Sequence, residues 1–125
     1  AAGRAWDDVL ALPESQAPGD LRWYHGDLLA ENLLARDGRL TAVLDFGGLA
    51  VGNPAVDLAV AWELLDPAAR TTFREAVGVG DGEWRLGRGW ALAMALMTFP
   101  YYWHTMPGRC ADRLAQARAV LADHA

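Results

Sequence analysis

Three oxygen-bearing side chains have types and spacing that suit phosphoryl transfer: Asp27, Asn32 five residues later, and Asp45 thirteen residues after that. This chemistry requires a protein to orient a hydroxyl group and to hold the metal ion that neutralises the phosphates. A carboxylate can accept the hydroxyl proton, and Asn and Asp oxygens are hard ligands suited to Mg²⁺. The pattern therefore predicts Asp27 as the catalytic residue, with Asn32 and Asp45 as metal ligands.

The segment between Asn32 and Asp45 has the pattern of a β-hairpin. Short apolar runs at residues 33–35 and 40–44 flank Asp37-Gly38, a dipeptide that favours tight turns. A hairpin reverses the direction of the chain, so we expect the two proposed metal ligands to lie together at its open end.

These motifs resemble those of the aminoglycoside phosphotransferase family, a branch of the protein-kinase-like fold that phosphorylates small molecules. The resemblance is carried by His25-Gly26-Asp27 with Asn32, by Asp45-Phe46-Gly47, and by residues 52–59. Protein kinases have Arg where Gly26 stands, so the small-molecule branch is the better match. The resemblance implies a kinase-like C-terminal lobe, mainly α with a small β-hairpin (α+β). It also implies ATP or GTP and Mg²⁺ as cofactors.

The resemblance also implies supporting roles. Leu34 would form part of the floor under the nucleotide base. Asp57 would tie the catalytic loop from below, although an Asp in the first turn of a helix can also act simply through the helix dipole. His25 is expected to pack behind the loop as a structural residue. Acidic side chains that could bind the acceptor are Glu31, Glu63 and Asp66, and for Glu31 a solvated loop charge is the competing interpretation.

Residues that bind the nucleotide in the resembled family are missing from this chain. All eleven basic residues are arginines, so the lysine that binds the α- and β-phosphates in the family's N-lobe is not here. Residues 78–82 superficially resemble a Gly-rich phosphate loop, but they follow a helical pattern and indicate a helix stop. We therefore expect residues 1–125 to form one domain, a C-terminal lobe without its N-lobe.

The amino-acid composition limits the classes of partner that the chain is expected to bind. The net charge of −5 at pH 7 argues against nucleic acid and favours a cationic acceptor. No apolar run is long enough to predict a membrane span. Cys110 is the single cysteine, which fits a reducing compartment and predicts a cytoplasmic protein.

Apolar periodicity and capping residues predict five helices. They span residues 4–12 (ended by Pro13), 53–65, 67–77, 81–99 (ended by Pro100) and 109–124, the last with an apolar stripe at Cys110, Leu114, Ala117 and Leu121. Residues 21–24 are expected to form a strand, 14–20 a polar loop and 47–52 a flexible turn. The apolar side chains of residues 84–99 would be buried, or would be partly covered by the missing lobe or by a partner such as a second copy in a homodimer.

The sequence leaves two classes of function open. The first is an ATP- and Mg²⁺-dependent O-phosphotransferase of a small molecule, with an aminoglycoside-type antibiotic as the preferred acceptor and antibiotic resistance as the role. Macrolides, homoserine, choline and sugars are alternative acceptors, and the chain by itself is expected to be inactive. The second class is a non-catalytic, kinase-like binding module.

Overall fold

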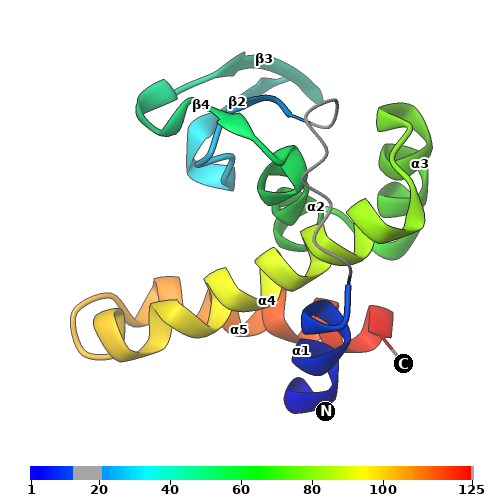
Figure 1. Cartoon of the computed structure of the whole chain (residues 1–125). Helices are drawn as coiled ribbons and strands as arrows, with labels where there is room; N and C mark the ends of the chain where they lie inside the picture. The colour runs from blue at the N-terminus through cyan, green and yellow to red at the C-terminus, as the bar shows by residue number, and fades with distance from the viewer. Residues whose placement is uncertain (13–20, 125) are drawn as a thin grey trace.

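The computed structural model describes residues 1–12 and 21–124 (Figure 1). Its helices and strands are α1 (Ala2–Leu10), β1 (Arg22–Tyr24), β2 (Leu33–Arg36), β3 (Arg39–Val43), β4 (Ala50–Gly52), α2 (Val60–Leu64), α3 (Pro67–Val77), α4 (Asp81–Tyr102) and α5 (Pro107–His124). Short 3₁₀ helices lie at η2 (Ala30–Asn32), η3 (Phe46–Gly48) and η4 (Pro54–Ala59). The described chain is thus mainly helical with small β-hairpin sheets, as predicted.

The hairpin between Asn32 and Asp45 is confirmed. Strands β2 and β3 pair antiparallel around Asp37-Gly38, and both turn residues have positive φ, +53° and +74°. Two consecutive positive φ angles define the type I′ turn that matches the twist of paired strands. The register shifts between Leu34 and Ala35, a bulge that the sequence pattern did not predict.

A second pair of strands was missed. Residues 47–52 were expected to be a flexible turn, but β4 pairs antiparallel with β1, with Trp23 opposite Val51. Three residues are too few to show a period, and the partner strand lies far away in the sequence. The pairing places residues 50–52 beside residues 22–24, which directly precede His25-Gly26-Asp27.

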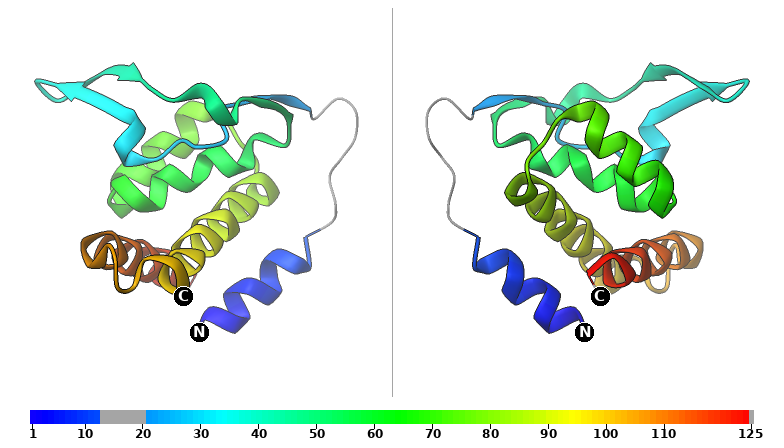
Figure 2. Two further views of the ribbon diagram at one scale, coloured as in Figure 1. Left: turned by 90° about the vertical axis from the view of Figure 1, so that its left-hand side faces the viewer. Right: turned by 90° about the vertical axis from the view of Figure 1, so that its right-hand side faces the viewer.

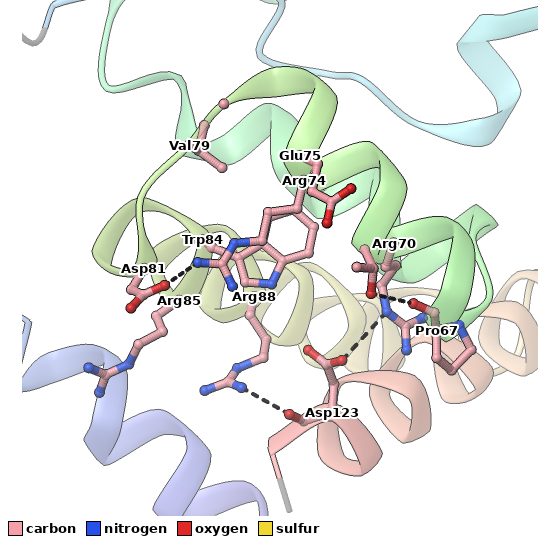
Figure 3. Close-up of a pocket in the computed structure, with 12 residues that line it drawn as sticks. Pro67, Arg70, Arg74, Glu75, Val79, Asp81, Trp84, Arg85, Arg88 and Asp123 are labelled. Carbon is pink, nitrogen blue, oxygen red and sulfur yellow. Dashed lines mark hydrogen bonds and ion pairs between the residues drawn. The ribbon is translucent and has the colours of Figure 1, made fainter.

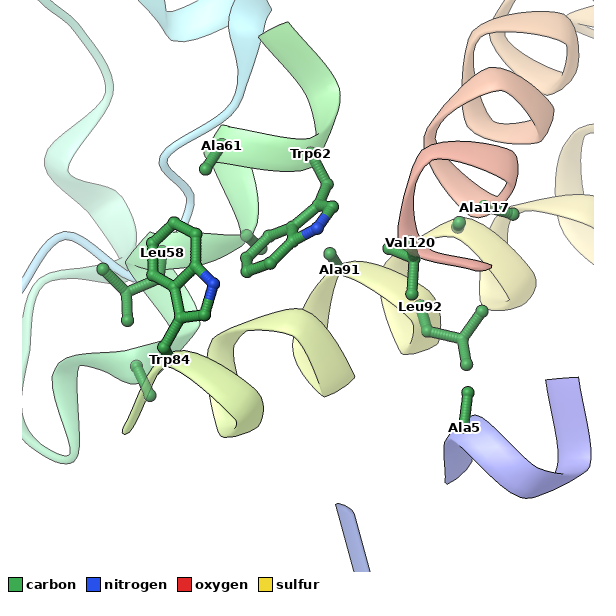
Figure 4. Close-up of a cluster of buried hydrophobic side chains, with 12 residues drawn as sticks. Ala5, Leu58, Ala61, Trp62, Trp84, Ala91, Leu92, Ala117 and Val120 are labelled. Atoms are coloured by element: carbon green, nitrogen blue, oxygen red, sulfur yellow. The ribbon is translucent and has the colours of Figure 1, made fainter. Parts of the chain in front are cut away.

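The core lies where α4 packs against η4, α5 and α1 (Figure 4). Trp62 of α2 and Trp84 of α4 contact each other with ring centroids 4.6 Å apart. Gly87 allows η4 to approach α4 closely, because a Cβ atom there would stand 2.6 Å from Leu58 Cβ. The strands lie on one side of α4 and α1 lies on the other (Figures 1 and 2). The strand β1, which leads into the predicted catalytic segment, therefore contacts η4, and η4 packs on the core.

The predicted helix 53–65 is two elements. Asn53 caps it as expected, since its Oδ1 accepts a hydrogen bond from Ala55 N at 2.9 Å, but residues 54–59 form a 3₁₀ helix before α2 begins. Residues three apart share a face in a 3₁₀ helix. This places the buried Ala55 and Leu58 together on the core, while Asp57 lies off that face.

Helix α3 agrees with the prediction at both ends. Asp66 Oδ1 accepts a hydrogen bond from Ala69 N at 2.8 Å as the N-cap, and Gly78 ends the helix with φ +68°. The start of α1 is two residues earlier than predicted. Pro13 and the predicted loop 14–20 lie outside the described residues.

The prediction that Pro100 ends the long helix is wrong, because α4 continues to Tyr102 with Pro100 inside it. A proline lacks the N–H that would bond the carbonyl one turn earlier, which is why it usually kinks or ends a helix. The bond from Trp103 N to Phe99 O, at 3.1 Å, keeps the turn closed beyond it. Helix α4 is therefore three residues longer than predicted.

Helix α5 begins at Pro107, two residues before the predicted start, and proline suits the first helical position. Its predicted apolar stripe is only partly correct. Cys110 and Ala117 are buried, but Leu114 is 41 % exposed. The buried face instead includes Arg113, which pairs with Glu63 of α2. None of the helices in the described ranges combines the length and hydropathy of a membrane span.

Candidate active site

The loop that carries Asp27 packs directly against the backbone that follows Asp45. Gly26 has φ +83°, and a Cβ atom there would stand 2.4 Å from Gly48 O. Only glycine combines this backbone conformation with so close an approach. The absence of a side chain thus brings the two predicted catalytic segments together.

Asp57 fastens the same loop from the core side. Its Oδ2 accepts a hydrogen bond from His25 N at 2.6 Å, and its Oδ1 accepts one from Gly26 N at 2.9 Å. Both amides precede Asp27 immediately, so the carboxylate fixes the direction in which the loop presents its next residue. This is the contact through which Asp57 would support catalysis.

Both ring nitrogens of His25 are occupied. Nε2 lies 2.8 Å from Leu44 O, which can only accept, and Nδ1 accepts a hydrogen bond from Asp27 N at 3.2 Å. Together they define the neutral imidazole that carries its proton on Nε2. The ring is buried and lies 4.8 Å from that of Phe46. His25 therefore ties the loop that carries Asp27 to the end of the hairpin, and both of its ring nitrogens are engaged.

Asn32 holds Asp27 directly. Its Nδ2 donates hydrogen bonds to the main-chain oxygen of Asp27 at 2.8 Å and to Oδ2 of the same residue at 3.1 Å. The Asn32 side chain is buried, so this contact is shielded from water. With its nitrogen turned toward Asp27, the amide has its Oδ1 left for another partner.

Asp45 stands beside Asn32 at the open end of the hairpin. Leu44 N donates to Asn32 O at 2.8 Å, which places the residue after Leu44 next to the 3₁₀ turn of Asn32. Asp45 is exposed, has φ +58°, and accepts a hydrogen bond from Gly47 N through Oδ1 at 3.2 Å. One amide oxygen and one carboxylate form a hard donor set of the kind that Mg²⁺ uses with water and phosphates as its other ligands.

In the described part of the chain, no group of three or more His, Cys, Asp and Glu side chains gathers at one place. The assignment of Asn32 and Asp45 as metal ligands stays a prediction.

A hollow of about 490 Å³ opens beside Asp27. The loop that carries Asp27 contributes Asp27, Leu29 and Glu31 to its lining. The last turns of α4 form the opposite wall, and two arginines of α5, Arg109 and Arg113, complete it. The volume is within the usual range for small-molecule sites.

The three acidic residues expected to bind the acceptor differ in position. Glu31 lines the hollow, where it pairs with Arg109. Glu63 lies behind the wall, nearly buried, with Oε1 at 2.8 Å from Arg113 Nη1 and Oε2 accepting from Ala30 N at 3.0 Å. Asp66 caps α3 and does not line the hollow. The structure thus brings Glu31 to Asp27, but neither Glu63 nor Asp66.

The functional motifs of the sequence do not include Arg109 and Arg113, although their spacing of four residues places them on one face of a helix. The Arg109 guanidinium also lies 5.3 Å from the ring centroid of Tyr102. Its hydrogen bond to Glu31 raises the pKa of Arg109 above the ordinary arginine value. This guanidinium therefore remains charged wherever the protein is folded.

A larger hollow of about 860 Å³ lies between α3 and α4 and contains none of the predicted site residues (Figure 3). Its arginines have partners on the protein itself. Arg74 pairs with Asp81 and lies over the Trp84 ring, and Arg88 Nη1 donates to Asp123 O at 3.2 Å. These contacts join α3, α4 and α5.

Comparison with known proteins adds one finding. A family model described as the phosphotransferase enzyme family matches residues 1–96. No curated protein matches the chain. No solved structure matches it either.

Proposed function

The chain belongs to the phosphotransferase enzyme family, and we propose that it is the catalytic C-terminal lobe of a kinase-like enzyme that phosphorylates a hydroxyl group of a small molecule. The γ-phosphoryl donor would be ATP or GTP, with Mg²⁺. The main support is that Asp27 stands at the edge of a hollow, held by Asn32 and by a loop fastened to Asp57.

In this proposal Asp27 orients the acceptor hydroxyl and accepts its proton as the oxygen attacks phosphorus. Asn32 Nδ2 binds Oδ2 of Asp27, which leaves Oδ1 of the same carboxylate to face the acceptor. A positioned base of this kind contributes about 10²- to 10⁴-fold to a rate. His25 and Asp57 act by holding the loop and do not touch the reacting atoms.

Asn32 Oδ1 and Asp45 would hold Mg²⁺, whose charge offsets that of the phosphates during transfer. The donor chemistry fits this ion, because both groups are oxygen ligands at the same end of the hairpin. Asn32 would then serve two partners, with its nitrogen on Asp27 and its oxygen on the metal.

Exposed apolar side chains on the strands support a covering N-lobe. Leu34 of β2 is 48 % exposed, which suits a place under a nucleotide base. Other large exposed apolar residues on or beside the strands are Trp23, Leu40, Phe46, Leu49 and Val51. Apolar surface of this kind marks contact regions. The covering lobe would supply the phosphate-binding lysine, and residues 1–125 without it would bind nucleotide poorly.

One property of the whole chain, its net charge, bears on the class of acceptor. The net charge of −5 favours a cationic, aminoglycoside-type acceptor, with macrolides, homoserine, choline and sugars as alternatives.

A homodimer through α4 also remains a proposal. Trp90, Leu96 and Met97 of α4 stay exposed, whereas its opposite face is buried within the chain.

The direct test is to replace Asp27 by Ala and by Asn in the phosphotransferase that contains this chain. We expect kcat to fall by about 10²-fold or more, with unchanged thermal unfolding. Asp37→Asn is the matched control, because Asp37 lies at the exposed hairpin turn and Asn tolerates its positive φ. Turnover that survives in Asp27→Ala would remove Asp27 from the mechanism. Ligand binding by a wild-type protein that transfers no phosphate would instead support the binding module.

A further inference from the structure

We infer that the acceptor is an amphipathic alcohol that carries at most one positive charge, with its hydroxyl at Asp27 and its apolar body against the end of α4. This rests on the proposed function, because it concerns the substrate of the same site. It departs from the polycationic acceptor that the net charge of the whole chain favours.

The α4 wall is continuous because the helix does not stop at Pro100. Met94, Met97, Thr98 and Tyr101 line the hollow. Their spacing of three, four and seven residues puts them on one face of a helix. If α4 had ended at residue 99, Tyr101 would have left this face. The extension through Pro100 therefore adds an aromatic ring to a methionine surface.

These side chains suit an apolar ligand with an irregular outline. Tyr101 is 77 % exposed, and its ring stands edge-on to that of Tyr102 with centroids 4.7 Å apart. Thioether side chains are flexible and polarizable, and they adapt to varied apolar shapes. Aromatic rings add contact area with few bonds to immobilise. Thr98 has its hydroxyl bonded to Met94 O at 3.0 Å, so even this polar residue presents little free hydrogen-bonding capacity.

The charges in and behind the hollow leave one carboxylate, that of Asp27, without an ion pair among the described residues. Of the two guanidiniums that line the hollow, that of Arg113 is already paired with Glu63 and does not offset the charge of Asp27. Glu31 is paired with Arg109, which also covers the Tyr102 ring. A polycation could displace Arg109 from Glu31, but it would then face the released guanidinium. The surroundings of Asp27 thus lack the surplus of negative charge that several ammonium groups require.

The remaining acidic candidates add no further free carboxylate to the hollow. Glu63 is held by Arg113 and by the amide of Ala30, and its side chain is 12 % exposed. Asp66 is used as the cap of α3. Both therefore serve the fold, and the net charge of the chain is carried mainly by residues outside the hollow.

The test compares three hydroxyl compounds by calorimetry on the phosphotransferase that contains this chain. Erythromycin has a large apolar body and one amine, kanamycin is a polyamine, and glucose is neutral without an apolar body. At about 0.15 M salt we expect erythromycin to bind at least tenfold more tightly than either of the others. Its affinity should change little between low and high salt, and its binding should have a negative heat-capacity change.

Two variants probe the two walls. Tyr101→Ser should weaken erythromycin binding about tenfold, whereas Leu114→Ser, on an exposed part of α5 outside the hollow, should not. Arg109→Ala should strengthen kanamycin binding by releasing Glu31. Arg118→Ala removes an exposed arginine of the same helix outside the hollow and should leave kanamycin binding unchanged.

The inference is overturned if kanamycin binds more tightly than erythromycin, if none of the three compounds binds, or if Tyr101→Ser has no effect. Its failure can be told apart from that of the proposed function. Phosphorylation of kanamycin that depends on Asp27 would sink only the acceptor class. Erythromycin binding that depends on Tyr101, without phosphate transfer, would sink only the catalytic proposal.

Discussion

The main chain of Gly26 lies against that of Gly48, with no room for a side chain between them. A Cβ atom on Gly26 would stand 2.4 Å from Gly48 O, and one on Gly48 would stand 3.0 Å from His25 O. The contact joins the residue before Asp27 to the turn after Asp45. The relative position of the two carboxylates therefore depends on a pair of glycines that perform no chemistry.

Replacing Gly26 by Ala should destabilise the fold by more than a positive φ alone explains. Gly38→Ala is the matched control, because Gly38 has φ +74° but nothing within 4 Å of its Cβ position. We expect a cost of about 1–2 kcal/mol for the control from backbone strain. The clash with Gly48 should add at least about 1 kcal/mol in Gly26→Ala. Urea unfolding measures both, and equal losses would contradict the close contact.

Replacing Asn32 by Asp separates its two proposed roles. An Asp would still offer an oxygen to a metal, but it would lose the donor that binds Oδ2 of Asp27 and would set two carboxylates together. We expect kcat to fall by at least about tenfold, as one lost hydrogen bond to a charged group implies. Asn53→Asp is the control, because either residue can cap η4. Full activity in Asn32→Asp would mean that only an oxygen is needed there.

Replacing Asp57 by Ala should loosen the catalytic loop. The change removes the acceptor of two amide N–H groups, and each unmet group costs about 1–3 kcal/mol. We expect amide hydrogen exchange at His25 and Gly26 to become faster under conditions in which the rest of the protein stays folded. Asp66→Ala removes a carboxylate that caps α3, so it should cost about 1 kcal/mol and leave exchange in the loop unchanged. Retained protection of both loop amides in Asp57→Ala would refute this role.

Glu63 and Glu31 should differ in their effect on stability. Glu63→Ala leaves Arg113 buried without its carboxylate, a change that costs about 3–5 kcal/mol. Glu31→Ala breaks a pair that is largely in water, which should cost at most about 1 kcal/mol. Chemical denaturation of both variants tests the contrast. Similar small losses would return Glu63 to the list of residues free to bind an acceptor.

Features set by local chemistry could be predicted from the sequence. The turn at Asp37-Gly38, the cap at Asn53 and the stop at Gly78 each depend on residues within a few positions. All three occur where they were expected. They were sufficient to predict the hairpin that brings Asn32 and Asp45 to one end.

Features set by distant partners could not be predicted in this way. Strand β4 is three residues long and forms only because β1 is available to pair with it. The buried face of α5 differs from the predicted apolar stripe, because Arg113 is buried in an ion pair with Glu63. Pro100 predicts a helix end because its local effect is unfavourable, yet α4 continues to Tyr102.

The two sides of the hollow differ in how they are anchored. Asp27 is tied through Asp57 to η4, which packs on the core, whereas the face around Met97 and Tyr101 is the exposed end of one helix. Substitutions on that helix end should redirect the enzyme to new compounds at little cost to folding, while the side that carries Asp27 stays fixed. Directed evolution of substrate range should therefore collect its first productive changes in the last two turns of α4.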